Sequence, residues 1–102
     1  MNKTDSKKLS EIFNDIDSYD STGWLFVKNK TYPFKSYNLG IAVYESDKDI
    51  PDKVGNYGIT LNIQTIQDII QVVKNQRPGA TIKDMIDSFN YYWKNDTFLD
   101  WR

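Results

Sequence analysis

The stretch from Asn62 to Trp101, NIQTIQDIIQVVKNQRPGATIKDMIDSFNYYWKNDTFLDW, decides the fold. Its apolar residues fall into two sets, each with the spacing of one face of an α-helix. The first set is Ile63, Ile66, Ile69, Ile70 and Val73, and the second is Ile82, Met85, Ile86, Phe89 and Trp93. The short Arg77–Ala80 connection predicts that the two helices, at 63–75 and 82–95, lie antiparallel and bury both sets in one core.

Upstream of these helices, three short apolar runs predict β-strands. Trp24–Val27 reads WLFV, which is rich in aromatic and β-branched residues. Tyr37–Tyr44 reads YNLGIAVY, and Gly40 within it indicates a bulge or the close approach of another backbone. Gly58–Leu61 can add a short third strand. The first two runs most simply pair antiparallel, with residues 28–36 as their connection.

The N-terminal part predicts one more helix. Its apolar stripe is Leu9, Ile12, Phe13 and Ile16. The helix is expected to follow an N-cap at Thr4 or Ser6 and to run to about Tyr19, with residues 1–6 frayed. The whole pattern predicts a single domain over residues 1–102 of the α+β class. In it, a small antiparallel sheet of two or three strands packs against the N-terminal helix and a C-terminal antiparallel helix pair.

The composition fits one folded domain with no strong preference for a charged partner. Of the 102 residues, 39% are hydrophobic and 15% are aromatic, which is enough apolar material for a core. The net charge of −1 gives no general attraction to nucleic acid or to an anionic membrane. The N-terminal sequence MNKTDSKKLSEIF lacks the apolar run of a signal peptide, and no segment approaches the ~20 apolar residues of a membrane span. We therefore expect a cytoplasmic protein.

The sequence offers little for catalysis. It contains no histidine and no cysteine, so the commonest general base, the thiol nucleophile and the usual zinc ligands are missing. Asp47-Lys48-Asp49 begins like a calcium-binding loop, but Asp52 stands where that loop needs glycine and Gly58 where it needs glutamate. We predict that the protein is not an enzyme and has no catalytic residue, cofactor or metal. A small carboxylate-based enzyme or regulatory domain stays open as an alternative.

Lysines and aromatic residues alternate after the first predicted strand. Lys28, Lys30 and Lys35 surround Tyr32 and Phe34. Such a pattern can bind single-stranded nucleic acid through phosphate contacts and base stacking. Lysine also protects the edge of a sheet from pairing with other strands. We favour the edge interpretation and expect no nucleic-acid partner, while a nucleic-acid-associated accessory protein remains an alternative function.

An acidic loop flanked by tyrosines is the candidate contact surface for a protein partner. Residues 45–53 carry four acids and two lysines, a net charge of −2, and residues 1–20 also carry −2. Complementary charge speeds the association of proteins, and aromatic side chains anchor their interfaces. The candidate protein-binding residues are Tyr44, Glu45, Asp47, Asp49, Asp52 and Tyr57.

The C-terminal stretch also carries a resemblance to known proteins. Gln64–Ile70 (QTIQDII), the Tyr91-Tyr92 pair and Asn95–Phe98 (NDTF) match recurring motifs of an uncharacterised family of short bacterial proteins. Proteins of this kind resemble toxin-immunity proteins of the contact-dependent growth inhibition type. The resemblance implies an immunity protein that binds and neutralises a bacterial toxin domain, for example a nuclease. A nuclease holds phosphates in a basic site, which an acidic and aromatic surface would suit.

Overall fold

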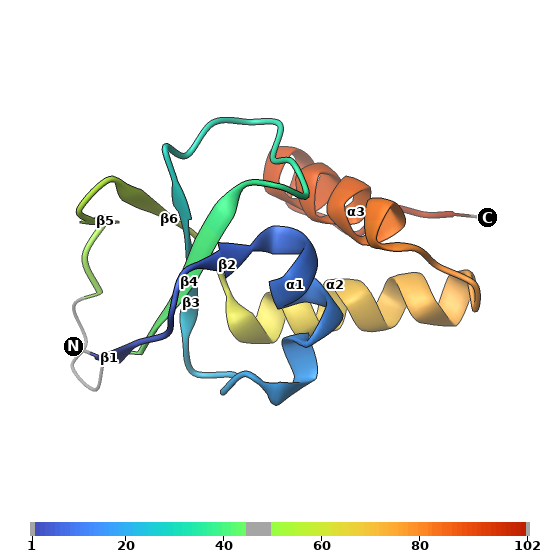
Figure 1. The fold of residues 1–102 in the computed structure, drawn as a ribbon. Helices are drawn as coiled ribbons and strands as arrows, with labels where there is room; N and C mark the ends of the chain where they lie inside the picture. Colours follow the sequence, from blue (N-terminus) through green and yellow to red (C-terminus); the bar gives the residue numbers. More distant parts are fainter. Residues whose placement is uncertain (1, 45–49, 102) are drawn as a thin grey trace.

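The protein folds as an antiparallel sheet with helices on one side, as the computed structural model of residues 2–44 and 50–101 shows (Figure 1). The strands of the described sheet are β1 Asn2–Lys3, β2 Lys7–Lys8, β3 Trp24–Lys28, β4 Leu39–Tyr44, β5 Lys53–Val54 and β6 Tyr57–Asn62. The helical segments in the same residues are α1 Leu9–Asn14, the short 3-10 helix η1 Ile16–Ser18, α2 Ile63–Gln76 and α3 Ile82–Asn95. The predicted α+β class is therefore confirmed.

The six strands form one sheet in the order β1-β4-β3-β6-β5, with β2 also paired to β4. All of these pairs are antiparallel, including the predicted pair of β3 and β4. β1 and β2 are two parts of one interrupted edge strand, because they lie opposite residues 43–44 and 39–40 of β4. Thr4 bridges the interruption: its N–H donates to Ala42 O, and its Oγ1 accepts from Ala42 N–H, both at 2.9 Å.

Three details of the sequence prediction are wrong. The sheet has more than the predicted two or three strands. The sequence did not indicate β1, β2 and β5, because strands of two residues are too short to show an alternating pattern. Residues 2–6 of the segment predicted to be frayed are held at the edge of the sheet by β1, Thr4 and β2, while Met1 lies outside the described residues. The first helix starts only at Leu9, because the Lys7 and Lys8 backbone already pairs with β4, and it ends at Asn14, before Asp15 leaves helical geometry.

The helices bury one face of the sheet, and the largest apolar cluster lies between them and the strands. Leu25 and Val27 of β3 belong to this cluster, while Trp24 and Phe26 belong to a smaller cluster on the opposite face, as the two-residue period of a strand requires. The helical segments contribute Leu9, Ile12, Phe13, Ile16, Ile63, Ile66, Ile70, Met85, Ile86 and Phe89 to the large cluster. The apolar stripes read from the sequence are therefore core.

Gly40 allows α1 to lie close to β4. A β-carbon at Gly40 would lie 3.0 Å from Leu9 Cδ2 and 3.2 Å from both Ile12 Cδ1 and Leu25 Cδ1. The sequence suggests a bulge or the approach of another backbone at this glycine, but the close contacts are made by side chains.

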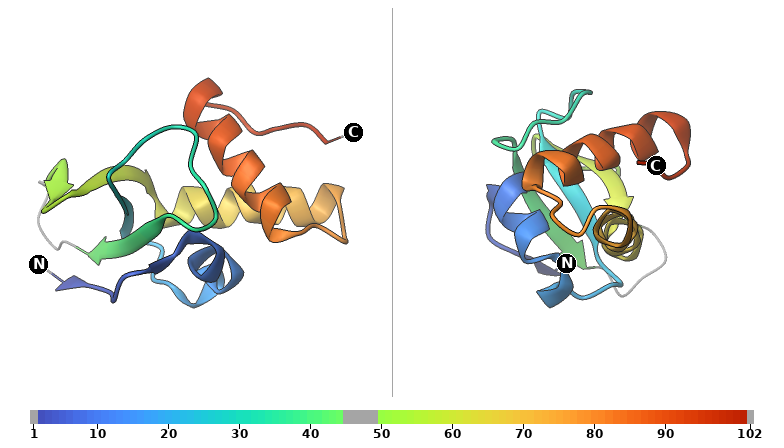
Figure 2. Two further views of the ribbon diagram at one scale, coloured as in Figure 1. Left: turned by 45° about the horizontal axis from the view of Figure 1, so that its top comes forward. Right: turned by 90° about the vertical axis from the view of Figure 1, so that its right-hand side faces the viewer.

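The two C-terminal helices begin and end where the sequence predicts, to within one residue. Asn62 caps α2, since its Oδ1 accepts from Thr65 N–H at 2.8 Å. At the start of α3, Thr81 Oγ1 accepts from Asp84 N–H at 3.3 Å and Asp84 Oδ2 accepts from Thr81 N–H at 3.0 Å. α3 ends at Asn95, and the next residue, Asp96, has a left-handed φ of 57°. The two helices pack together, but α3 crosses α2 obliquely and does not lie antiparallel along it as predicted (Figures 1 and 2).

The C-terminal tail docks on both helices. Trp101 N–H donates to Gln76 Oε1 at 2.7 Å, and Trp101 Nε1–H donates to Ser88 Oγ at 3.0 Å. The Arg77 guanidinium lies 4.6 Å from the centre of the Trp101 ring, within cation–π range. These contacts join the tail to the end of α2 and to a buried residue of α3.

Candidate functional site

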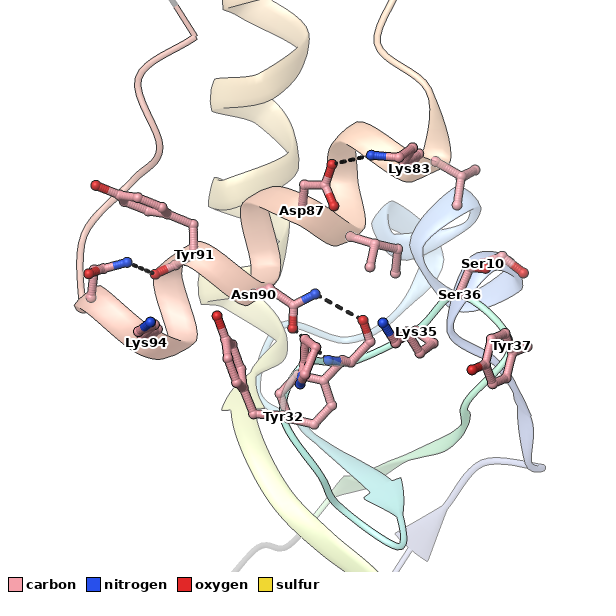
Figure 3. Close-up of a pocket in the computed structure, with 15 residues that line it drawn as sticks. Ser10, Tyr32, Lys35, Ser36, Tyr37, Lys83, Asp87, Asn90, Tyr91 and Lys94 are labelled. Carbon is pink, nitrogen blue, oxygen red and sulfur yellow. Dashed lines mark hydrogen bonds and ion pairs between the residues drawn. The ribbon is translucent and has the colours of Figure 1, made fainter.

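A groove of about 910 Å³ lies between residues 32–37 and α3 (Figure 3). Ligand pockets in proteins have volumes of this order. One wall belongs to the connection between β3 and β4, and the other is one face of α3. We name it the α3 groove, and its lining consists of Ser10, residues 32–37, Ile82, Lys83, Ile86, Asp87, Asn90, Tyr91, Lys94 and Asn95.

Asn90 joins the loop wall of the groove to the helix wall. Phe34 N–H donates to Asn90 Oδ1 at 2.7 Å, and Asn90 Nδ2 donates to Phe34 O at 2.9 Å. The Phe34 ring is buried, with its centre 5.2 Å from that of Phe89 and 5.7 Å from that of Trp93. The loop is therefore held through both its backbone and its side chain. Because of these contacts the groove is preformed, and it does not depend on a ligand to order it.

Three tyrosines on the groove walls present much of their side chains to solvent. Tyr37 is 67% exposed, Tyr32 is 44% exposed and Tyr91 is 37% exposed. Tyr32 and Tyr91 lie toward the C-terminal end of α3, and Tyr37 lies toward its N-terminal end (Figure 3). A tyrosine offers a broad apolar ring and a polar hydroxyl to a partner. Single exposed aromatics are ordinary, but three around one concave site are typical of a contact surface.

The groove walls carry more positive than negative charge. Lys35, Lys83 and Lys94 line the groove together with the carboxylate of Asp87. Lys83 Nζ donates to Asp87 Oδ2 at 2.8 Å, and this hydrogen bond raises the pKa of Lys83. Lys94 Nζ lies 5.9 Å from the centre of the Tyr32 ring. Within the described residues Lys35 and Lys94 form no ion pair, so the groove presents two positive charges without an acidic partner.

The structure does not bring the two predicted binding tyrosines onto one surface. Tyr44 packs against the large cluster on the helical face, and burial raises the pKa of its phenol. Tyr57 packs against the smaller cluster on the opposite face, and its hydroxyl shares a 2.8 Å hydrogen bond with Ser6 Oγ. Asp52 is exposed. The other predicted residues, Glu45, Asp47 and Asp49, lie outside the described residues, so the role of the acidic loop stays a prediction.

The edge interpretation of Lys28, Lys30 and Lys35 is wrong. β3 lies inside the sheet, paired to both β4 and β6, so Lys28 protects no free edge. Lys30 Nζ donates to Ile59 O at 3.1 Å and lies 5.3 Å from the centre of the Trp93 ring. Lys35 lines the α3 groove. The outer strands β1 and β2 carry the exposed lysines of the edge, which are Lys3, Lys7 and Lys8.

Sequence reasoning missed the α3 groove because its walls come from distant parts of the chain. The hydrogen-bonded pair Phe34 and Asn90 is 56 residues apart in the sequence. Taken alone, residues 31–36 indicate only a connection with a proline. The available signal was Tyr91, an aromatic residue on the otherwise polar face of a predicted amphipathic helix.

Two carboxylates have clear local roles. Asp20 Oδ1 accepts from the N–H and the Oγ1 of Thr22, both at 2.9 Å, and these bonds lower the pKa of Asp20. The bond from Thr81 N–H likewise lowers the pKa of Asp84. Within residues 2–44 and 50–101, no group of three or more acidic side chains is placed to hold a metal ion. No helix in those residues is long and apolar enough to cross a lipid bilayer.

Comparison with known proteins identifies the family of the chain. Residues 6–101 match a family described as a domain of unknown function, DUF7716, and the chain belongs to this family. The comparisons with curated proteins and with solved structures gave no match. The family description assigns no activity, so the function has to be inferred from the α3 groove and from the residues around it.

Proposed function

We propose that this DUF7716 protein is a binding protein that recognises another protein, and that it acts in the cytoplasm as an immunity protein against a bacterial toxin domain. The observation that carries the proposal is the preformed α3 groove with its three exposed tyrosines. In many protein complexes the backbone of the interface moves little on binding, so the binding surface is already ordered in the free protein. The hydrogen bonds of Asn90 to the loop wall supply that order.

The chemistry of the chain favours binding over catalysis. The chain has neither histidine nor cysteine. A carboxylate general acid needs a raised pKa, whereas the pKa values of Asp20 and Asp84 are both lowered by hydrogen bonds to the local backbone. Three tyrosines line the groove, and tyrosine is enriched at protein interfaces.

The toxin as partner rests on the resemblance of the C-terminal stretch to immunity proteins. The matching residues Gln64–Ile70 and Tyr91–Tyr92 lie in α2 and α3, Asn95 is the last residue of α3, and Asp96–Phe98 follow it. Tyr91 lines the groove, and Asn95 Nδ2 donates to Tyr91 O at 3.0 Å. Two residues of the resembling motifs, Tyr91 and Asn95, therefore line the proposed binding site, while others such as Ile66 and Ile70 are buried.

Growth rescue tests the proposal. The toxic domain is taken from a gene immediately upstream of the gene for this chain and is expressed in a sensitive bacterium. We predict that co-expression of this chain restores growth and that the two purified proteins elute together in size-exclusion chromatography. Arrested growth despite co-expression, together with separate elution, would contradict the proposal.

A further inference from the structure

We infer that the α3 groove binds an extended, acidic segment of the partner protein, with carboxylates of the segment at Lys35 and Lys94. The inference builds on the proposed function, in which the partner is a protein, and it names the part of the partner that this chain recognises. The observations behind it are the unpaired charges of the groove, its length and the apolar side chains at its base.

The charge of the groove selects an acidic ligand. Lys83 is neutralised by Asp87 at 2.8 Å, which leaves the ammonium groups of Lys35 and Lys94 as the net charge of the walls. The two lysines lie on opposite walls, Lys35 on the loop and Lys94 on the helix (Figure 3). A carboxylate between the walls can therefore reach a cation from either side. Ion pairs at the rim of an interface set its orientation and speed its formation.

The length of the groove selects an extended segment. The lining residues of α3 run from Ile82 to Asn95, a helical rise of about 20 Å. An extended chain of about six residues covers that distance. Ile82 and Ile86 line the groove near its N-terminal end, and Ile86 is part of the core. In an extended peptide alternate side chains point to opposite sides, so apolar residues can face the isoleucines while acidic residues face the lysines.

A peptide fits these walls better than single-stranded nucleic acid. Over about 20 Å a nucleic-acid strand brings about six phosphates, given one charge per ~3.4 Å of strand. The groove meets them with only two free lysines, because the charges of Lys83 and Asp87 offset each other. Asn95, Ser10 and Ser36 offer amide and hydroxyl groups that can hydrogen-bond to a peptide backbone. Charge and hydrogen-bonding capacity thus both favour a protein segment.

Fluorescence anisotropy with defined probes tests the inference. The first probe is a labelled hexapeptide in which glutamate alternates with leucine. The second has glutamine in place of glutamate, and the third is a short labelled oligothymidylate. The protein is used as wild type, as the double variant Lys35→Gln/Lys94→Gln, and as the matched double variant Lys7→Gln/Lys74→Gln. The matched pair removes the same charge from two exposed positions outside the groove.

We expect the acidic peptide to bind more tightly than its glutamine counterpart and more tightly than the oligothymidylate. The Lys35→Gln/Lys94→Gln variant should bind the acidic peptide about tenfold more weakly, because each exposed ion pair contributes up to about fivefold. The Lys7→Gln/Lys74→Gln variant should bind like the wild type. All the substituted lysines are exposed, so equal thermal midpoints should show that the fold is retained.

Three results would overturn the inference: equal binding of the acidic and glutamine peptides, equal weakening by both double variants, or tighter binding of the oligothymidylate. The same variants in the growth-rescue experiment separate the inference from the proposed function. If both double variants neutralise the toxin as well as the wild type does, the groove is not the contact, while the immunity function stands. If the wild type binds the acidic peptide through Lys35 and Lys94 but fails to neutralise the toxin, the inference about the groove is supported and the proposed immunity function is contradicted.

Discussion

At the scale of single residues, Asn90 links the core to the candidate binding site. Its side-chain amide makes two hydrogen bonds to the Phe34 backbone, at 2.7 and 2.9 Å, across 56 residues of sequence. These bonds satisfy a backbone N–H and a backbone C=O that would otherwise need water molecules in the groove as hydrogen-bond partners. One side chain therefore sets both the position of the loop and the shape of the site.

Replacing Asn90 by alanine should loosen the loop wall. The Phe34 N–H and C=O would lose their partners, which should lower the free energy of unfolding by about 1–3 kcal/mol. Hydrogen exchange at the Phe34 amide should become much faster. Asn75→Ala is a suitable control, because Asn75 is exposed on α2 and accepts only from Gln71 Nε2 on its own helix. Unchanged protection of the Phe34 amide in Asn90→Ala would contradict the role given to this residue.

Alanine substitutions at Gly40 and Gly79 test the packing of α1 on β4. A methyl group at Gly40 would press on Leu9, Ile12 and Leu25 at 3.0 to 3.2 Å, so Gly40→Ala should destabilise the fold by about 1–3 kcal/mol. Gly79→Ala meets no atom within 4 Å and should change the stability by less than about 1 kcal/mol. Urea unfolding of both variants measures the difference. Equal midpoints would show that α1 does not pack on β4 as described.

At the scale of elements, α3 has two functions on two faces. Its buried face places Met85, Ile86 and Phe89 in the core, and its other side supplies Lys83, Tyr91 and Lys94 to the groove. The capping box of Thr81 and Asp84 fixes where the helix starts. The packing of Met85, Ile86 and Phe89 in the core sets which of its residues face the groove.

The cap of α3 should make the folded state less stable as the pH falls below about 4. The pKa of Asp84 is lowered, first by the hydrogen bond from Thr81 N–H and further by the charge of Arg77. The charged carboxylate therefore stabilises the folded state above its unfolded pKa of about 4, and this stabilisation is lost as the pH falls through the lower folded pKa. We expect Asp84→Asn to have a lower thermal midpoint than the wild type at pH 7, with the two midpoints converging in acid. A difference between the two thermal midpoints that stays constant down to acidic pH would contradict this role of Asp84.

The long elements could be predicted from the sequence, and the short ones could not. α2 and α3 have 14 residues each, so their apolar periodicity and caps repeat often enough to be read. β1, β2 and β5 have two residues each and exist only because β4 and β6 offer them hydrogen bonds. For the same reason the N-terminal helix starts later than the predicted cap at Thr4 or Ser6 implies, since β2 takes the residues before Leu9.

The candidate site was the least predictable feature. The sequence draws attention to Tyr44, Tyr57 and the acidic residues between them, because charge and aromatics are adjacent there along the chain. The structure turns Tyr44 and Tyr57 toward opposite faces of the sheet. It places Tyr32 and Lys35 beside Tyr91 and Lys94 instead, through the tertiary contact of Phe34 with Asn90. Local sequence holds no information on such a contact.

At the scale of the whole molecule, local charges and not net charge should govern binding. The chain carries a net charge of −1, yet residues 1–20 carry −2 while the α3 groove is basic. Exposed charges further apart than about 10 Å are largely screened at moderate salt, so each region acts on the part of the partner that it faces. A partner segment in the groove should therefore be acidic even if another part of the partner is basic.

Hydrogen exchange of the complex is the most direct test of the claim that the α3 groove is the binding surface. The protein is measured alone and with the toxin domain that it neutralises in the growth experiment. We predict slower exchange in residues 31–37 and 83–95 on binding, with little change in the segment 50–57 that belongs to the predicted acidic loop region. Slower exchange confined to 50–57, with 31–37 and 83–95 unchanged, would contradict the account and would place the contact at the acidic loop instead.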